Sequence, residues 1–201
     1  MARYGKDHKQ ATRQRIIERA GRRFKRHGID GSGIAALMSD AGLTNGAFYA
    51  HFASKDDLVT HAVADQLRAQ RESFAAQASD GGPGQVVREY LSVRHRDNPG
   101  EGCPSAALLD EIGRSSDATK QAYTEGLLAI IDGLNARSAP DDPEAARVKT
   151  LSVFAMMVGT LQLSRALSDP ELADAVLEQG LRNVLAVRSA GQPNRPAGTG
   201  S

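Results

Sequence analysis

The stretch from Ser32 to Lys55, SGIAALMSDAGLTNGAFYAHFASK, limits the possible folds more than any other part of the chain. Apolar residues recur at helical spacing up to Ala41, and Gly42 then supplies a residue suited to the left-handed turn that ends a helix. Thr44 stands where the capping residue of a second helix is expected. Two short helices joined by a tight glycine turn are the layout of a helix-turn-helix motif.

The second predicted helix of this motif has one apolar side. Phe48 and Phe52 are four residues apart and face the same way, whereas Asn45, Tyr49 and His51 face elsewhere. A helix this short is not stable alone, so its aromatic residues must pack against neighbouring elements. An ordinary helical hairpin in a bundle would show the same spacing, and for this segment alone that alternative stays open.

The charge of the chain is concentrated at its front, although the formal net charge is only +1. The basic residues between positions 3 and 26 are Arg3, Lys6, Lys9, Arg13, Arg15, Arg19, Arg22, Arg23, Lys25 and Arg26. Ile16, Ala20 and Phe24 recur at helical spacing among them, which predicts an amphipathic helix with a basic outer face. Such asymmetry is typical of a nucleic-acid-binding end, while a merely solvated basic face is the alternative.

Composition predicts a globular, cytoplasmic, all-α protein of about nine helices. The chain has 201 residues, is 40% hydrophobic, and shows no long apolar run or secretory leader, so we expect no membrane segment. Its single cysteine, Cys103, excludes an internal disulfide framework and a multi-cysteine zinc site. We expect no cofactor and no metal site.

The run AGLTNGAFYAHFASKDDL, residues 41–58, is similar to the signature of the TetR family of transcriptional regulators. In that family a glycine turn leads into a short recognition helix that ends in an aromatic residue, a serine and a lysine. The resemblance covers about the first third of the chain. The sequence departs from the family pattern at Gly31–Gly33, where relatives commonly have a threonine-rich stretch, and at Ala50, which is often polar or aromatic in relatives.

We expect the second motif helix to enter the major groove of double-stranded DNA. The residues predicted to lie against base edges are Asn45, Gly46 and Ala47, and those predicted to contact phosphates are Ser32, Thr44, Tyr49, His51 and Lys55. Asn45 is the leading candidate for base readout, because an amide offers adenine both a donor and an acceptor. Gly46 would let the backbone approach the duplex.

The remaining chain divides into further helices, which are separated by residues that typically end or begin a helix. Ser54 opens a capping box for a long helix that we expect to end at Gly81–Gly84, with a next helix from about Gln85 to Arg96. Capping residues at Asp117, Asp142 and Asp169 each precede a later helix. We predict a DNA-binding domain at residues 1–53, a ligand-binding and dimerisation domain at 54–188, and a disordered tail at 189–201.

The last two predicted helices carry more apolar surface than a small domain needs to bury, with small residues at Ala155 and Gly159. The family resemblance implies that this pair forms a homodimer interface, and a core of the monomer is the alternative. A small-molecule effector is expected in the body. The residues weighed for its pocket are Tyr90, Arg94, His95, Tyr123, Phe154, Met156 and Met157.

Cys103 precedes Pro104, which is predicted to begin a helix, and a helix N-terminus favours the thiolate. The segment EGCPSAALLDEI also resembles a TetR branch that includes a regulator responding to electrophiles through a cysteine near this position. Cys103 is therefore a possible sensor, and a buried, inert cysteine is the alternative.

Taken together, these features predict a ligand-responsive DNA-binding regulator, most often a repressor in the family that the motif resembles. A helical protein-interaction module without DNA binding is the main alternative. An enzyme using Cys103 with His95 is the weaker one, because the two residues form no recognisable catalytic spacing.

Overall fold

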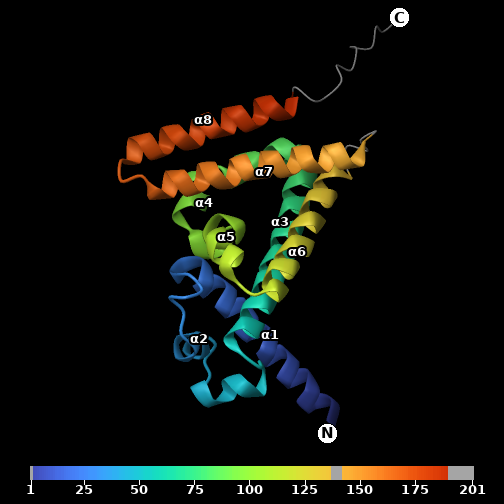
Figure 1. Ribbon diagram of the computed structural model, residues 1–201, viewed down its shortest axis with the longest axis vertical. Helices are drawn as coiled ribbons and strands as arrows, with labels where there is room; N and C mark the ends of the chain where they lie inside the picture. Colours follow the sequence, from blue (N-terminus) through green and yellow to red (C-terminus); the bar gives the residue numbers. More distant parts are fainter. Residues whose placement is uncertain (1, 137–141, 190–201) are drawn as a thin grey trace, which may run out of the picture.

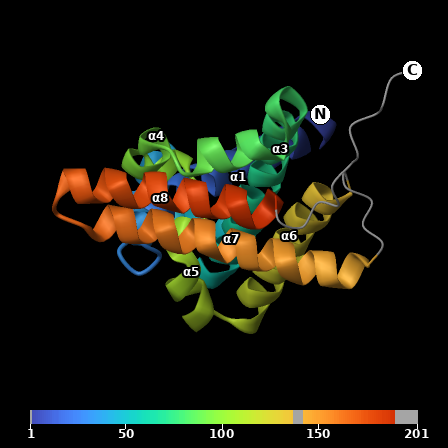
Figure 2. The same ribbon diagram turned by 90° about the horizontal axis from the view of Figure 1, so that it is seen from above.

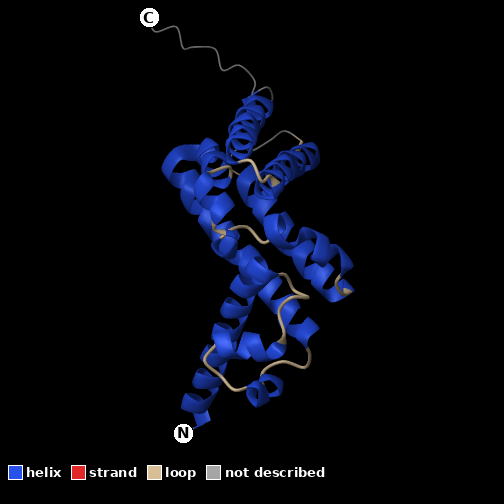
Figure 3. Cartoon of the chain, turned by 90° about the vertical axis from the view of Figure 1, so that its left-hand side faces the viewer, coloured by secondary structure: helices blue, strands red, loops and turns tan. Residues whose placement is uncertain are grey.

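The computed structural model describes residues 2–136 and 142–189, and every regular element within those ranges is a helix (Figure 3). The elements are α1 (Ala2–His27), α2 (Ile34–Asp40), the 3-10 helix η1 (Asn45–Ala50), α3 (Lys55–Tyr90), α4 (Val93–Asp97), the 3-10 helix η2 (Pro99–Glu101), α5 (Ser105–Arg114), α6 (Asp117–Asn135), α7 (Pro143–Ala166) and α8 (Pro170–Ser189). The prediction of an all-α fold is confirmed. Apart from Ser189, the predicted tail lies outside the described residues.

The helices form two parts, which we call the head and the body (Figure 1). The head consists of α1, α2 and η1, and the body consists of α3 to α8. α3 starts beside the head and runs away from it alongside α6, while α7 and α8 lie side by side across the far end of the body (Figures 1 and 2). No helix in the described ranges is apolar over a stretch long enough to span a bilayer.

The predicted apolar side of the first helix is buried. Ile16 and Ala20 are fully buried and Phe24 is 1% exposed, and they belong to the same core cluster as Leu37 of α2 and Phe48 of η1. Burying a large apolar side chain contributes about 1.5–3 kcal/mol, so these contacts hold together elements that are too short to be stable alone.

The glycine-rich stretch in the middle of α3 breaks the helical path, as the sequence predicted. Gly81 and Gly82 have non-helical backbone angles, and the φ of +70° at Gly82 is one that a glycine adopts without strain. The chain resumes as a helix at once and continues to Tyr90, so α3 is two helical segments joined at a kink. The predicted helix from Gln85 to Arg96 is interrupted, because the Ser92 hydroxyl accepts from the His95 amide and starts α4 separately.

Most of the predicted helix starts are confirmed. The Ser54 hydroxyl accepts from the Asp57 amide at 3.1 Å, and the carboxylates of Asp142 and Asp169 each accept from two amides of the following turn. The prediction for Asp117 is wrong by one residue, since the Ser116 hydroxyl accepts from the Thr119 amide and Asp117 is the first helical residue.

Candidate nucleic-acid interface

The second element of the motif is held to the head by its two phenylalanines. Phe48 is fully buried and Phe52 is 2% exposed, and their ring centroids lie 5.7 Å apart. The element is the 3-10 helix η1 rather than the predicted α-helix, and the Thr44 side chain makes no capping hydrogen bond to it. A span of six residues allows few α-helical bonds, so packing of the aromatic rings determines its position.

The opposite side of η1 is open to solvent. Thr44, Asn45 and Gly46 are exposed, and Tyr49 is 71% exposed. Ala47 is only half-buried and packs against the core, so its methyl group is less available than the prediction assumed. The exposed residues form a polar surface on one face of η1, and this surface is open to solvent.

The side chain of Ser32 is not part of this surface. Ser32 is fully buried, and its hydroxyl donates to the Gly28 carbonyl at 2.7 Å. The prediction that its hydroxyl contacts a phosphate is therefore wrong for this conformation, because the group is used to close the turn between α1 and α2. Gly28 itself has a φ of +76°, which ends α1 in the left-handed conformation.

His51 and Lys55 flank the polar surface. His51 is half-buried, and its Nδ1 is buried without a hydrogen-bond partner among the described residues. Burial lowers the pKa of His51, and the nearby cations Lys9 and Arg13 lower it further. Lys55 is the first residue of α3 and is half-exposed, and of the amides in this turn Ser54 caps that of Asp57. A cation and free helical amides at the same place suit a phosphate contact.

Arg13 of α1 supports this end of the head, a role that the sequence did not indicate. Its guanidinium lies 4.7 Å above the Phe52 ring centroid, and its Nε donates to the His51 carbonyl at 3.4 Å. The two contacts join residues 38 and more positions apart, so no local pattern reveals them. Arg13 fixes the end of η1 while adding positive charge beside it.

The basic residues of α1 serve two different purposes. Arg22 and Arg26 form ion pairs with Glu101, and Arg23 pairs with Asp40. These cations are therefore bound within the protein. Nearer the N-terminus, the exposed side chains of Lys9, Arg15 and Arg19 form no ion pair among the described residues. The cationic surface available to an anionic partner lies in the part of α1 from Lys9 to Arg19, which also carries Arg13.

A carboxylate of the body holds the head at the other end of α1. Glu111 of α5 accepts from the Ile29 amide at 2.8 Å and from the Asp30 amide at 3.1 Å. These amides begin the turn that leads into α2. The position of the motif is thus tied directly to α5, which belongs to the body.

Cys103 and His95, which the sequence offered as a sensor and as a base, lie together but are not arranged for catalysis. Cys103 is 1% exposed. The His95 Nε2 accepts from the Cys103 amide at 2.9 Å, and its Nδ1 donates to the Tyr90 carbonyl at 2.7 Å. Burial lowers the pKa of His95 to about 4, so the ring is neutral and both nitrogens are occupied. The geometry gives no support to a Cys103–His95 pair as nucleophile and base.

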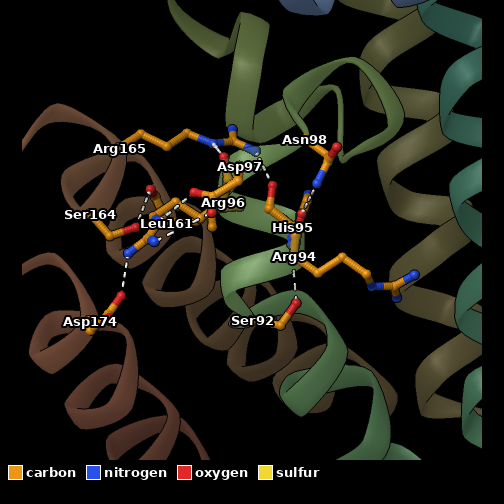
Figure 4. A network of polar contacts seen from close by, with 10 residues as sticks. All are labelled: Ser92, Arg94, His95, Arg96, Asp97, Asn98, Leu161, Ser164, Arg165 and Asp174. Atoms are coloured by element: carbon orange, nitrogen blue, oxygen red, sulfur yellow. Dashed lines mark hydrogen bonds and ion pairs between the residues drawn. The ribbon is translucent and has the colours of Figure 1, made fainter. Parts of the chain in front are cut away.

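The short helix α4, which carries His95, is fastened to α7 and α8 (Figure 4). The Arg165 guanidinium of α7 donates to the carbonyls of His95, Arg96 and Ala106 at 2.8–3.0 Å. The Arg96 side chain in turn pairs with Asp174 of α8. Arg165 therefore joins the end of α4 to the first turns of α5, using backbone acceptors instead of a carboxylate.

The sequence and the fold both have known relatives. Residues 16–62 match the family described as bacterial regulatory proteins, tetR family. The transcriptional regulator AcrR of Shigella flexneri is 33% identical over 93 residues, which is 45% of this chain and 43% of AcrR. The regulator TtgR of Pseudomonas putida is 39% identical over 75 residues, 37% of this chain and 35% of TtgR. The matches thus span less than half the length of these relatives.

The similarity in fold extends over nearly the whole chain. A TetR transcriptional regulator from Chloroflexus aurantiacus superimposes with a TM-score of 0.70 at 22% identity, covering 91% of this chain and 96% of the other. The reduced form of NemR from E. coli gives a TM-score of 0.66 at 18% identity, covering 87% and 95%. The head thus matches the tetR family of bacterial regulatory proteins over residues 16–62, and the chain shares the overall fold of these solved regulators.

Proposed function

We propose that the protein is a DNA-binding transcriptional regulator that reads a palindromic site as a homodimer. The observation that carries this proposal is the exposed polar face of η1, which two buried phenylalanines hold beside unpaired cations of α1. Asn45 would read a base edge, Gly46 would allow close backbone approach, and Lys55, Thr44 and Tyr49 would position the phosphates. Repression, release by a small-molecule effector and a cytoplasmic location are parts of the same proposal.

The outer face of α7 and α8 supports the dimer. In α7, Ala155, Met156, Gly159 and Leu163 are exposed at helical spacing, and Leu163 is 54% exposed. The neighbouring exposed face of α8 begins at Leu172, which is 49% exposed. Small residues between larger apolar ones let two helices of different chains approach closely. A two-fold axis at this face would give two copies of η1 for two half-sites.

Two head variants test the division of roles on DNA. A binding site is first selected from random duplexes, and the affinities of the variants for selected and unrelated duplexes are then measured over a series of salt concentrations. Lys55→Ala should weaken binding to all duplexes and reduce the salt slope by about one unit, whereas Asn45→Ala should mainly relax the sequence preference. Lys149→Ala, which changes an exposed lysine of α7, is the matched control and should leave both quantities unchanged.

The same measurements separate the proposal from its main alternative. A helical protein-interaction module would show no salt-sensitive retention on duplex DNA, and the selection would then yield no consensus. Equal losses in Asn45→Ala and Lys55→Ala on every duplex would contradict the assigned roles. For the dimer, Leu163→Glu places a charge on the α7 face and should yield a monomer in sedimentation equilibrium. A dimer that survives this change would place the interface elsewhere.

A further inference from the structure

A cavity of about 750 Å³ lies between the head and the body. One wall is α1, which contributes residues from Gln14 to Lys25, and a second wall is the first segment of α3. The third is the segment from Glu89 to Cys103, which contains α4 and η2. Of the residues weighed for an effector pocket, Tyr90, Arg94 and His95 line this cavity, whereas Tyr123, Phe154, Met156 and Met157 do not.

The buried end of the cavity contains a hydroxyl group without a strong hydrogen-bond partner. Tyr90 is 2% exposed, and its hydroxyl lies beside the Cys103 thiol, a weak hydrogen-bonding group, with no nitrogen or oxygen partner among the described residues. A buried hydroxyl left unpaired costs about 1–3 kcal/mol, and a ligand that hydrogen-bonds to it would recover that cost. On the α3 wall, Gln77 likewise has a buried Oε1 without a donor.

Lys25 brings a buried positive charge to the same end. It is 8% exposed, and its Nζ donates to the Gly102 carbonyl at 2.8 Å, while no carboxylate of the described residues lies within ion-pair distance. Burial lowers the pKa of Lys25 to about 8, so the side chain is still mostly charged at neutral pH. A short series of contacts connects Lys25 to Tyr90: the Gly102 carbonyl accepts from Lys25, the adjacent Cys103 amide donates to His95, and the His95 and Tyr90 ring centroids lie 4.7 Å apart. Lys25 and Tyr90 both line the cavity.

The other charges around the cavity are largely compensated. The ion pairs are Arg22 with Glu101, Arg68 with Asp65, and Arg94 with Glu89. The carboxylates of Glu18 and Glu72 belong to exposed residues at the mouth. His95 cannot supply a donor, because both of its ring nitrogens are already bonded. The buried charge that has no acidic partner is therefore that of Lys25.

We propose that this cavity binds a small organic carboxylate, with the carboxylate group held by Lys25 and Tyr90. The remainder of the ligand would extend along α3, where Phe74 presents an apolar surface and Gln77 accepts a hydrogen bond. The anion would compensate the buried ammonium and satisfy the Tyr90 hydroxyl together. This inference rests on the proposed function, since it identifies the chemical class of the effector and places it against α1 of the head.

Matched pairs of probes test the proposal on the full-length chain. Binding of benzoate, 2-naphthoate and octanoate is measured by isothermal titration calorimetry, alongside benzamide, 2-naphthamide and octanamide, which keep the shape and lose the charge. At least one carboxylate should bind about tenfold more tightly than its amide, because a charge-assisted hydrogen bond is roughly twice as strong as a neutral one. Equal affinity within each pair, or no binding of any carboxylate at millimolar concentration, would overturn the proposal.

Two variants locate the site. Tyr90→Phe removes only the hydroxyl, and Lys25→Met keeps most of the aliphatic stem while removing the charge. Each should weaken carboxylate binding by about tenfold and amide binding by less, because the amide oxygen still accepts a hydrogen bond but carries no charge. Lys149→Met is the control and should bind like the parent. Unchanged carboxylate affinity in Tyr90→Phe, the variant least able to disturb folding, would refute the assigned site.

The test of carboxylate binding and the test of DNA binding can fail independently of each other. The same preparations are assayed on the selected duplex without any probe. If the parent protein binds the duplex but binds each carboxylate no more tightly than its amide, only the proposed ligand class is refuted. Protein that binds carboxylates selectively but shows no salt-sensitive affinity for duplex DNA would refute the proposed function, while the carboxylate site would stand.

Discussion

The buried Lys25 predicts an unusual dependence of stability on pH. Burial lowers its pKa in the folded protein from 10.5 to about 8, with a smaller opposing effect from Glu101 and smaller lowering effects from Arg22 and Arg26. Between those two pH values the unfolded chain binds more protons at this residue than the folded protein. The free energy of unfolding should therefore rise with pH in this window.

The size of the effect follows from the two pKa values. Lys25 should add about 1.3 kcal/mol to the free energy of unfolding between pH 7 and pH 9, and about 2.5 kcal/mol between pH 7 and pH 10. Lys25→Met has no such group and should lack this gain. The prediction thus concerns how steeply the free energy of unfolding rises with pH in the parent compared with Lys25→Met, and not the absolute stability of either protein.

The assay is urea unfolding at a series of pH values, followed by circular dichroism at one protein concentration, so that any self-association affects all samples equally. Lys149→Met removes an exposed lysine and should follow the parent curve. Parallel curves for the parent and Lys25→Met from pH 7 to pH 10 would refute the reasoning, because they would show that Lys25 titrates as an ordinary exposed lysine.

Three further predictions concern the head and Cys103. Glu111→Ala leaves the amides of Ile29 and Asp30 without their acceptor, and it should lower the free energy of unfolding in urea by about 1–3 kcal/mol, against about 0–0.5 kcal/mol for the exposed neighbour Asp110→Ala. An equal effect of both would show that Glu111 does not hold the head. Phe48→Ala should cost about 3–5 kcal/mol and abolish retention on duplex DNA, because η1 loses its buried anchor; DNA retention at wild-type strength would be inconsistent with that role. Cys103 should react with iodoacetamide at least about tenfold more slowly in the native protein than in urea, and equal rates would show that its thiol is accessible as a sensor would require.

The sequence was most informative where a structure depends on neighbouring residues. The turn at Gly42, the caps at Ser54, Asp142 and Asp169, and the inward side of Phe48 and Phe52 all depend on positions a few residues apart. Propensity and spacing describe such interactions well. The motif and the all-α fold could therefore be predicted before any tertiary contact was known.

The failures have two causes, the burial of a local turn and contacts between distant residues. Ser32 looked like a surface hydroxyl, but the turn after α1 buries it against the Gly28 carbonyl. The basic residues Arg22 and Arg26 looked like part of a nucleic-acid surface, but Glu101 of the body pairs with both. Glu101 cannot be identified as a partner from local spacing, because the fold alone brings residues about 75 positions apart into contact. The Ser32 bond is local, but its burial depends on how the turn packs in the folded head.

The segment from Ser92 to Cys103 explains how a carboxylate in the cavity could affect DNA binding. At one end Arg165 of α7 holds the carbonyls of His95 and Arg96, so this part of the cavity wall is fastened to the helices proposed to form the dimer. At the other end the Gly102 carbonyl accepts from Lys25 of the head. In the proposed site the carboxylate competes with that carbonyl for the same ammonium. Because α1 also carries Arg13, which supports η1, a small displacement of Lys25 would be transmitted along one rigid helix to the candidate DNA-binding surface.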